Sequence, residues 1–338
     1  MIWSILNLVF LGFVALSLGC AHAGDGDGKS ENGDDESHGK FEFALIGDTP
    51  YRDAAQFENV LSSINANKKI KFVLHAGDIK TGSSACSDEL FADRLARFNR
   101  FEVPFVITPG DNEWTDCHRV AAGQYQPLER LAKLRQVFYP VPGRTLGRKT
   151  FKVETQDIDP QHAEFVEHVR WTRQRVTFAT LHMVGSQNGL DSFDSKSAAQ
   201  RTPADDNEVA RRIAASVAWV RSTFAQAKAE AARGVLFLFQ ANPNFPAAPG
   251  SADRKGFDEV LAALQEEVIA FGKPVVLAHG DSHYMRVDKP VRINGTAISN
   301  LTRVETFGDS DYHWLRVAVD PDSREVFSVH QEIVEANR

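Results

Sequence analysis

The sequence predicts an α/β fold in which two packed mixed β-sheets are flanked by helices on their outer faces. Three Gly-Asp pairs, which end at Asp48, Asp78 and Asp111, each follow a short apolar run. They recur at intervals of about 30 residues, the length of one strand–helix repeat. Further apolar runs alternate with helical patterns in the second half of the chain. Such alternation is typical of largely parallel sheets whose faces are covered by helices.

Strands and helices alternate regularly through the first half of the domain. Apolar residues recur at helical spacing between the Gly-Asp pairs, Ser87 is suited to cap the second helix, and Pro140 ends the third. We therefore expect strands over residues 41–47, 71–77 and 104–110, and helices over residues 52–67, 87–101 and 126–139.

The second half predicts a second sheet. Residues 150–154 and 170–187 have the pattern of antiparallel strands, and the fully apolar run 235–243 is expected to be a central strand. A long amphipathic helix is expected over 206–234 and another over 253–272, each ended by a glycine, with a buried strand over 273–283. Residues 284–333 alternate and turn in the manner of a small β-meander.

The N-terminus is predicted to be a secretory signal peptide. Residues 1–23 are an apolar run followed by a small-x-small cleavage pattern ending at Ala23. Lipidation at Cys20 and an uncut membrane anchor are the alternatives, in that order. Residues 24–40 are rich in Gly and Asp and are expected to form a disordered linker before the domain at 41–338. We therefore expect a secreted or periplasmic protein with no membrane span after cleavage.

Two cysteines remain after cleavage, and both are predicted to lie in loops near the same sheet edge. Cys86 follows the second Gly-Asp pair and Cys117 follows the third. Because an exported protein meets an oxidising compartment, a Cys86–Cys117 disulfide is expected, with two buried free thiols as the alternative.

Charge argues against a nucleic-acid partner. The formal net charge of the 338-residue chain is −7, and no basic cluster interrupts it. Proteins that bind nucleic acid present a basic face to the phosphates, so we expect none here. No particular oligomeric state is predicted.

Asp48, Asp78 and Asp111 are expected to meet in space. In a parallel sheet the carboxyl ends of the strands lie at one edge, and ligands bind in the crevice there. Carboxylates that meet without a partner repel one another and are costly to remove from water. A bound cation is the simplest way to hold them together, so the sequence predicts a metal site at this edge.

The series of motifs resembles that of the calcineurin-like metallophosphoesterases, a group that includes the purple acid phosphatases. The family pattern runs GDxH, GDxxD, GNHE, a lone His and then GHxH. The corresponding segments here are ALIGDTPY, VLHAGDIKTG, VITPGDNEW, a strand that ends in a polar residue before Pro243, and HGDSH. The similarity extends over about residues 41–315 and implies the two-sheet fold of that family.

The resemblance assigns metal ligands residue by residue. Asp48 matches the first metal-binding Asp, although Pro50 replaces the His two positions later. Asp78 matches the Asp that bridges two metals. Asp111 stands where the family has an Asn ligand.

The last motif departs further from the family pattern. Asp281 aligns with the first of its histidines and His283 with the second, while His279 is a further candidate ligand in a shifted register. The lone His of the family falls near residues 240–242, where this chain has none. Because the implied site is rich in carboxylates, we expect one or two divalent ions, with Mn²⁺, Mg²⁺, Ca²⁺ or Fe favoured over Zn²⁺.

The resemblance also suggests residues for the chemistry. Asn112 stands where the family has its catalytic His and has no titrating proton to give, so His118 and His182 are the substitute candidates. His182 ends a strand and fits a buried core histidine equally well. Arg119 is a candidate clamp for a phosphate oxygen, and Asn188 is a candidate substrate contact in a loop that is otherwise expected to be solvated.

The function implied by the resemblance is a secreted metal-dependent phosphoesterase that hydrolyses phosphate mono- or diesters with activated water. Its partner is then a small phosphorylated substrate. The missing histidines motivate an alternative, a catalytically degenerate protein that binds a phosphorylated ligand or a metal without turnover. A hydrolase of a different bond that uses the same metal is the third hypothesis.

Overall fold

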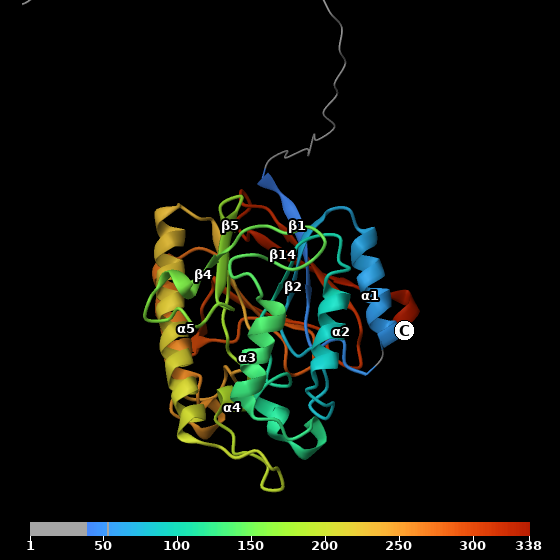
Figure 1. Ribbon diagram of the computed structural model, residues 1–338. Coiled ribbons are helices and arrows are strands. Elements are labelled where there is room, and N and C mark those ends of the chain that lie inside the picture. Colours follow the sequence, from blue (N-terminus) through green and yellow to red (C-terminus); the bar gives the residue numbers. More distant parts are fainter. Residues whose placement is uncertain (1–38, 53) are drawn as a thin grey trace, which may run out of the picture. The chain divides into compact units, whose positions relative to one another are not determined.

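Two β-sheets pack face to face, and helices cover the outer face of each, as the computed structural model shows (Figure 1). The structure describes residues 39–52 and 54–338. The predicted signal peptide and the predicted linker, apart from its residues 39 and 40, lie outside the described residues. The α/β fold class with two mixed sheets is confirmed.

The first sheet carries the three Gly-Asp strands. Its order is β14-β13-β1-β2-β3, with β1, β2 and β3 parallel and β13 antiparallel to β1. The expected strand–helix repeats are therefore confirmed for the first half of the chain. The bounds are β1 Phe41–Ile46, β2 Ile70–His75, β3 Phe105–Ile107, β13 Trp314–Val319 and β14 Phe327–Glu332.

The second sheet has seven strands in the order β4-β5-β6-β7-β8-β12-β9. Strand β7 is the middle one, as its fully apolar sequence predicts, and β5 is antiparallel to β4 and β6 as expected. The bounds are β4 Glu154–Thr155, β5 Val169–Arg173, β6 Val176–Thr180, β7 Gly234–Leu238, β8 Val275–His279, β9 Arg286–Asp288 and β12 Leu301–Glu305. A separate hairpin joins β10 Arg292–Ile293 to β11 Thr296–Ala297.

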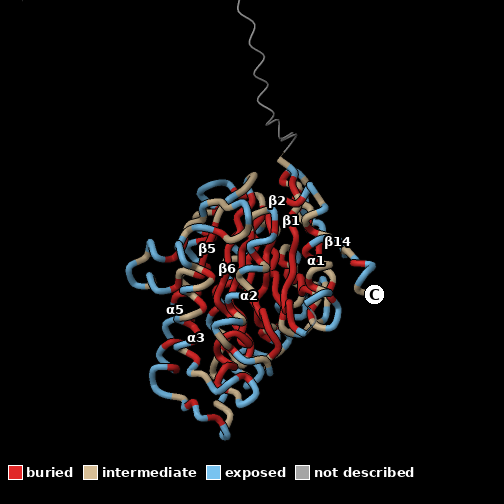
Figure 2. The backbone as a smooth tube through the Cα atoms, turned by 45° about the vertical axis from the view of Figure 1, so that its right-hand side comes forward, coloured by how far each residue is buried: buried red, intermediate tan, exposed pale blue. Residues whose placement is uncertain are grey.

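Three apolar clusters hold the layers together. The cluster between the sheets is built from alternate residues of both, such as Phe43 and Phe72 from the first and Phe178 from the second. A second cluster packs α1, α2 and α3 on the outer face of the first sheet, and a third packs α5 and α6 on the second. Figure 2 shows the buried residues running along the central strands.

The helices largely follow the predicted pattern. Ser87 caps α2 by accepting the Leu90 N–H, and Gly272 ends α6 in the left-handed conformation, both as predicted. The α-helices are α1 Ala54–Ala66, α2 Asp88–Phe98, α3 Pro127–Phe138, α5 Pro203–Ala229 and α6 Asp258–Phe271, and α4 Gly185–Gly189 is a single turn. Short 3-10 helices occupy Thr115–His118, Val120–Ala122, Gln156–Ile158, Ala252–Arg254 and Glu335–Asn337.

Two predictions about the second half were wrong. The long helix α5 ends at Ala229, because Ala231 adopts a positive φ of 53° and Gly234 begins β7. Residues 284–333 do not form a meander. Strand β12 pairs parallel to β8, whereas β13 and β14 join the first sheet and cover the otherwise open edge of β1.

No helix in the described part of the chain combines the length and the apolar composition that a membrane span requires.

The disulfide predicted between Cys86 and Cys117 is present, with the two Cα atoms 5.8 Å apart. It joins the loop after β2 to the short helix after β3, 31 residues later. Both sulfurs are buried and lie against the carbonyl oxygen of Asn112, at 3.5 and 3.7 Å. The cross-link therefore fixes the backbone of two site loops.

Replacing both cysteines, as Cys86→Ala/Cys117→Ala, is expected to lower the free energy of unfolding by about 3 kcal/mol, because the unfolded chain loses a loop constraint. Chemical denaturation of the wild type and the variant measures the difference. Wild type unfolded in a thiol reductant is the control and should match the variant. Equal denaturation midpoints for wild type, the variant and reduced wild type would show that the disulfide does not contribute to stability.

Candidate metal centre

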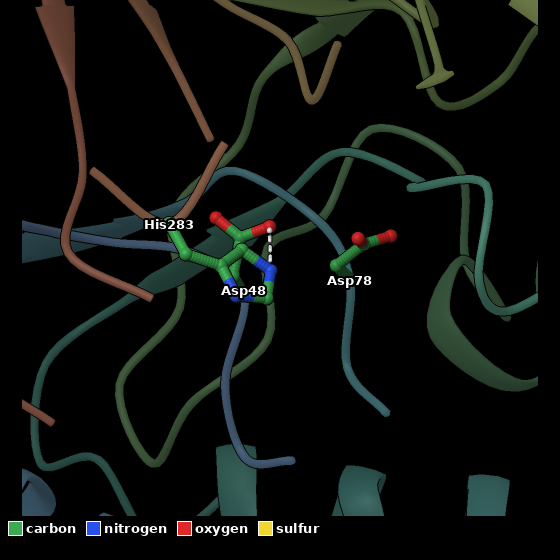
Figure 3. Close-up of side chains that lie close together, drawn as sticks. All are labelled: Asp48, Asp78 and His283. Atoms are coloured by element: carbon green, nitrogen blue, oxygen red, sulfur yellow. Dashed lines mark ion pairs between the residues drawn. The ribbon is translucent and has the colours of Figure 1, made fainter. Parts of the chain in front are cut away.

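Acidic side chains from both sheets meet at the carboxyl ends of the strands. Asp48 follows β1, Asp78 follows β2 and Asp111 follows β3, while Asp281 and His283 follow β8 of the facing sheet. Figure 3 shows His283 beside Asp48, with Asp78 next to them. The structure thus brings together five of the residues predicted to bind metal.

These side chains form two overlapping groups suited to hold a cation. Asp48, Asp78 and His283 make up the first, and Asp78, Asp111 and Asp281 make up the second. Within each group the ligand atoms lie within 4.8 Å of one another. Asp78 belongs to both, so it is placed to be shared by two ions.

Glycines in the motifs make this convergence sterically feasible. A Cβ atom at Gly110 would lie 2.1 Å from Asp78 Oδ1, and one at Gly280 would lie 2.1 Å from Asp48 Oδ2. Gly110 therefore leaves room for the carboxylate after the neighbouring strand β2, and Gly280 for the carboxylate after β1 of the facing sheet. Asp48 and Asp78 themselves adopt positive φ angles of 52° and 57°, which Asp tolerates better than most residues.

Burial and mutual repulsion disfavour the charged forms of these carboxyls. Desolvation raises the pKa of Asp48 and of Asp78 well above the usual range, and neighbouring carboxylates raise both further. Desolvation, followed by repulsion from Asp111, raises the pKa of Asp281 to about 7. Divalent cations would remove this repulsion, so the donor set fits a metal centre.

The orientation of His283 also fits metal binding. Its Nδ1 lies 2.8 Å from the carbonyl oxygen of Asp309, which accepts a hydrogen bond only if Nδ1 carries the proton. The unprotonated Nε2 then faces the cluster, 3.6 Å from Asp48 Oδ1 and 3.3 Å from the Tyr51 hydroxyl. A backbone carbonyl that selects the tautomer is the usual support of a metal-binding histidine.

Two buried charged residues brace the loops around the carboxylates. Glu113 accepts the backbone N–H groups of Gly110, Asp78 and Ile79, at 2.6 to 3.3 Å. Lys80 is fully buried and donates to the carbonyl oxygens of Thr81 and Asn112, and desolvation lowers its pKa to about 8. Since its bonds go to carbonyls, Lys80 does not take the place of a cation among the carboxylates.

Asn112 and Arg119 lie beside the cluster. The Asn112 amide nitrogen donates to Asp78 Oδ2 at 2.9 Å and to the Tyr51 hydroxyl at 2.8 Å. Arg119 contacts Asp116 at 2.7 Å, and its side chain is 43% exposed. His118 stacks on Phe193 in a small cleft. Asp116 and Ser186 also line this cleft.

Three of the predicted site residues lie outside the cluster. His279 points toward the helix side of the second sheet and stacks on Phe239, so we remove it from the proposed ligands. His182 is fully buried with Nδ1 2.7 Å from Glu167 Oε1, the core histidine of the alternative interpretation. Asn188 uses its amide inside the fold, where it bonds the Val184 N–H and the Gly256 carbonyl.

Several residues of the site were not anticipated from the sequence. Tyr51 donates to Asp78 Oδ2 at 2.8 Å, and its place three residues after Asp48 is the only signal that pointed to it. Ser186 contacts both Asp111 and Asp116 from a distant loop, a contact without any sequence signal.

The sequence profile of the calcineurin-like phosphoesterases matches residues 41–285. The chain belongs to the calcineurin-like phosphoesterase family. Members of the family typically bind divalent metals, in agreement with the carboxylate and histidine groups found here. A search of curated protein sequences finds no match.

Solved structures similar to this calcineurin-like phosphoesterase have low sequence identity. GAP50, the anchor in the inner membrane complex of Plasmodium, is 9% identical, with a TM-score of 0.42 over 88% of this chain and 89% of that chain. Purple acid phosphatase PPD1 from yellow lupin is 12% identical, with a TM-score of 0.47 over 89% of this chain and 55% of that chain. The 5′-nucleotidase from Candida albicans is 12% identical, with a TM-score of 0.44 over 86% of this chain and 50% of that chain.

The cluster carboxyls are expected to stabilise the metal-free protein less as pH rises from about 4 to about 7, whereas buried histidines such as His75 and His168, whose pKa values are lowered by burial, act in the opposite direction. Because the folded-state pKa of Asp281 is raised to about 7, the folded carboxyl retains a proton that the unfolded one has lost. Asp48 and Asp78 shift in the same direction. Melting temperatures of metal-free wild type and of Asp281→Asn at pH 5 and pH 8 isolate the contribution of Asp281.

Addition of Mn²⁺ should raise the melting temperature more at pH 8 than at pH 5, since the cation replaces the protons. Asp281→Asn removes one of the titrating carboxyls, so the melting temperature of the metal-free variant relative to wild type should be higher at pH 8 than at pH 5. A difference between variant and wild type that is the same at both pH values would contradict this account of the carboxylate cluster.

Proposed function

We propose that the protein is a metal-dependent phosphoesterase that hydrolyses phosphate mono- or diesters. The observation that carries the proposal is the pair of overlapping ligand groups that share Asp78. The first group would hold one cation and the second another, and such a pair would supply the two-metal chemistry that stabilises the oxygens of a phosphoryl transfer.

The two groups differ in chemistry. The first offers two carboxylates and the imidazole of His283, which suits Mn²⁺ or Fe as well as harder ions. The second offers the carboxylates of Asp78, Asp111 and Asp281, a set that favours Mg²⁺, Ca²⁺ or Mn²⁺ over Zn²⁺. When bound, the cations supply a water nucleophile at neutral pH and neutralise charge on the phosphoryl oxygens.

Arg119 is proposed to bind the substrate. Its planar guanidinium can hold two phosphate oxygens at once, and its partial exposure leaves it accessible. An anionic phosphate can approach the four carboxylates only where cations offset their charge, so substrate binding at this site depends on the metal. Asn188 is not retained as a substrate contact, since its amide is used within the fold.

The leaving group receives little help from a proton donor. The Asn112 amide occupies the family position of the catalytic His and donates to Asp78 and Tyr51. His182 is committed to Glu167, so His118 is the remaining candidate. Its Nδ1 accepts the Asp194 N–H at 3.1 Å, which leaves Nε2 as the nitrogen that can carry a proton.

A binding protein without turnover is the second candidate function. It is favoured by the replacement of the catalytic histidine by Asn112. It is also favoured by Gln240, which lies near the position of the family's lone histidine and accepts a hydrogen bond from the Gly185 N–H. Such a protein would retain the metal site and the phosphate contact but would not accelerate hydrolysis.

We further propose that the protein is exported, to the periplasm or outside the cell. The Cys86–Cys117 disulfide supports this proposal, because such cross-links persist in oxidising compartments. The signal-peptide pattern over residues 1–23 agrees with it.

Aryl phosphates are expected to be hydrolysed faster than alkyl phosphates by the Mn²⁺-loaded protein. An aryl leaving group departs without a proton, whereas general acid help is typically worth about 10²–10⁴-fold for a poor leaving group. Comparison of kcat/KM for an aryl and an alkyl phosphate measures the preference. Asp78→Asn should abolish both activities, because both ligand groups contain this residue.

Glu102→Gln is the matched control, since it also exchanges a carboxylate for an amide but lies at the surface away from the site. It should retain full activity. If wild type and Asp78→Asn are equally inactive with Mn²⁺, Mg²⁺ and Zn²⁺, the phosphoesterase proposal is wrong and the binding function takes its place.

A further inference from the structure

Four successive residues after β6 have left-handed backbone conformations. Ser186, Gln187, Asn188 and Gly189 have φ angles of 49°, 53°, 56° and 80° and form the turn α4. Only the last is a glycine. Residues with a Cβ atom adopt this conformation at an energetic cost, and a run of three is found only where surrounding contacts enforce it.

Contacts from other elements enforce the turn. The Asn188 side chain accepts the Val184 N–H at 3.2 Å and donates to the Gly256 carbonyl at 2.8 Å, which closes the turn on itself and on the loop before α6. Arg212 of α5 donates to the Asn188 carbonyl oxygen at 2.9 Å. Arg212 is itself fully buried and paired with Glu208 at 2.7 Å, so this support is rigid.

The start of the turn is held from the opposite side. The Gly185 N–H donates to Gln240 Oε1 at 2.6 Å. A Cβ atom at Gly185 would lie 2.6 Å from Asp111 Oδ2, so the backbone of the turn lies directly against the metal-ligand carboxylate. The turn therefore occupies one of the two lone pairs of the Gln240 amide oxygen.

The turn presents one polar group to the site, the hydroxyl of Ser186. Its Oγ lies 2.9 Å from Asp111 Oδ2 and 2.8 Å from Asp116 Oδ1. A hydroxyl has one hydrogen to donate. The two carboxylates share this one hydrogen, and Arg119, 2.7 Å from Asp116 Oδ2, offsets the charge of Asp116 without it.

We propose that Ser186 is a positioning residue that orients the Asp111 carboxylate toward the cation of the second ligand group. The proposal rests on the function proposed above. The Ser186 hydroxyl holds Asp111 Oδ2 and so fixes the rotation of the carboxylate that shares a ligand group with Asp78 and Asp281. The strained turn α4 then has a functional reason, because it fixes a hydroxyl beside the ligand carboxylate.

The test is to remove the hydroxyl without disturbing the turn. Ser186→Gly does so, because glycine adopts a positive φ without strain and the variant should be at least as stable as wild type. Gln187→Gly is the matched control, since it relieves the same strain one residue later, at a side chain with no hydrogen bond to the ligand groups. Calorimetric titration of each metal-free protein with Mn²⁺ measures affinity, and thermal melting measures stability.

Ser186→Gly is expected to weaken Mn²⁺ binding by about 10–100-fold, the usual effect of losing a partner of a metal ligand, with an undiminished melting temperature. Gln187→Gly should bind Mn²⁺ as wild type does. Unchanged affinity in Ser186→Gly, or an equal loss in both variants, would overturn the assignment of Ser186 while the metal site stands. A wild type that binds no Mn²⁺ would overturn the metal site and the role of Ser186 with it.

Discussion

The repulsion among buried carboxylates is the constraint on which the rest of this structure depends. Asp48, Asp78 and Asp111 of the first sheet are buried, and they meet the half-buried Asp281 of the second sheet. Their burial disfavours the charged forms, and Lys80, the nearest buried ammonium, is bonded to carbonyl oxygens instead. Folding therefore creates a site whose charge balance needs protons at low pH and divalent cations at neutral pH.

The surrounding structure serves to hold these carboxylates in place against that repulsion. Glycines leave space for neighbouring carboxylates. Glu113 links the loops after β2 and β3 by accepting hydrogen bonds from their backbone N–H groups, and the disulfide joins the same two loops covalently. Tyr51 and Asn112 both donate to Asp78 Oδ2, the oxygen of the carboxylate common to the two ligand groups. A site preorganised in this way needs no rearrangement to accept its ions.

Features that follow from periodicity could be predicted from the sequence. Features that depend on which face of a strand a residue occupies, or on contacts between distant segments, could not. Asp48, Asp78 and Asp111 were predictable because each follows a strand of a regular repeat. His279 was not, because its motif does not reveal which face of β8 it occupies, and alternation places it with Leu277 on the helix side. The position of β13 was equally unpredictable, because it pairs with β1 across a long separation in sequence, as the pair of Phe41 and Val319 shows.

The number of Mn²⁺ ions bound per chain tests the central claim most directly. The account predicts two ions for wild type, one for Asp281→Asn, which affects only the second ligand group, and none for Asp78→Asn, which affects both. Elemental analysis of protein equilibrated with Mn²⁺ and freed of unbound ion gives this number. Wild type without bound metal, or Asp78→Asn that binds as many ions as wild type, would contradict the shared-carboxylate metal centre.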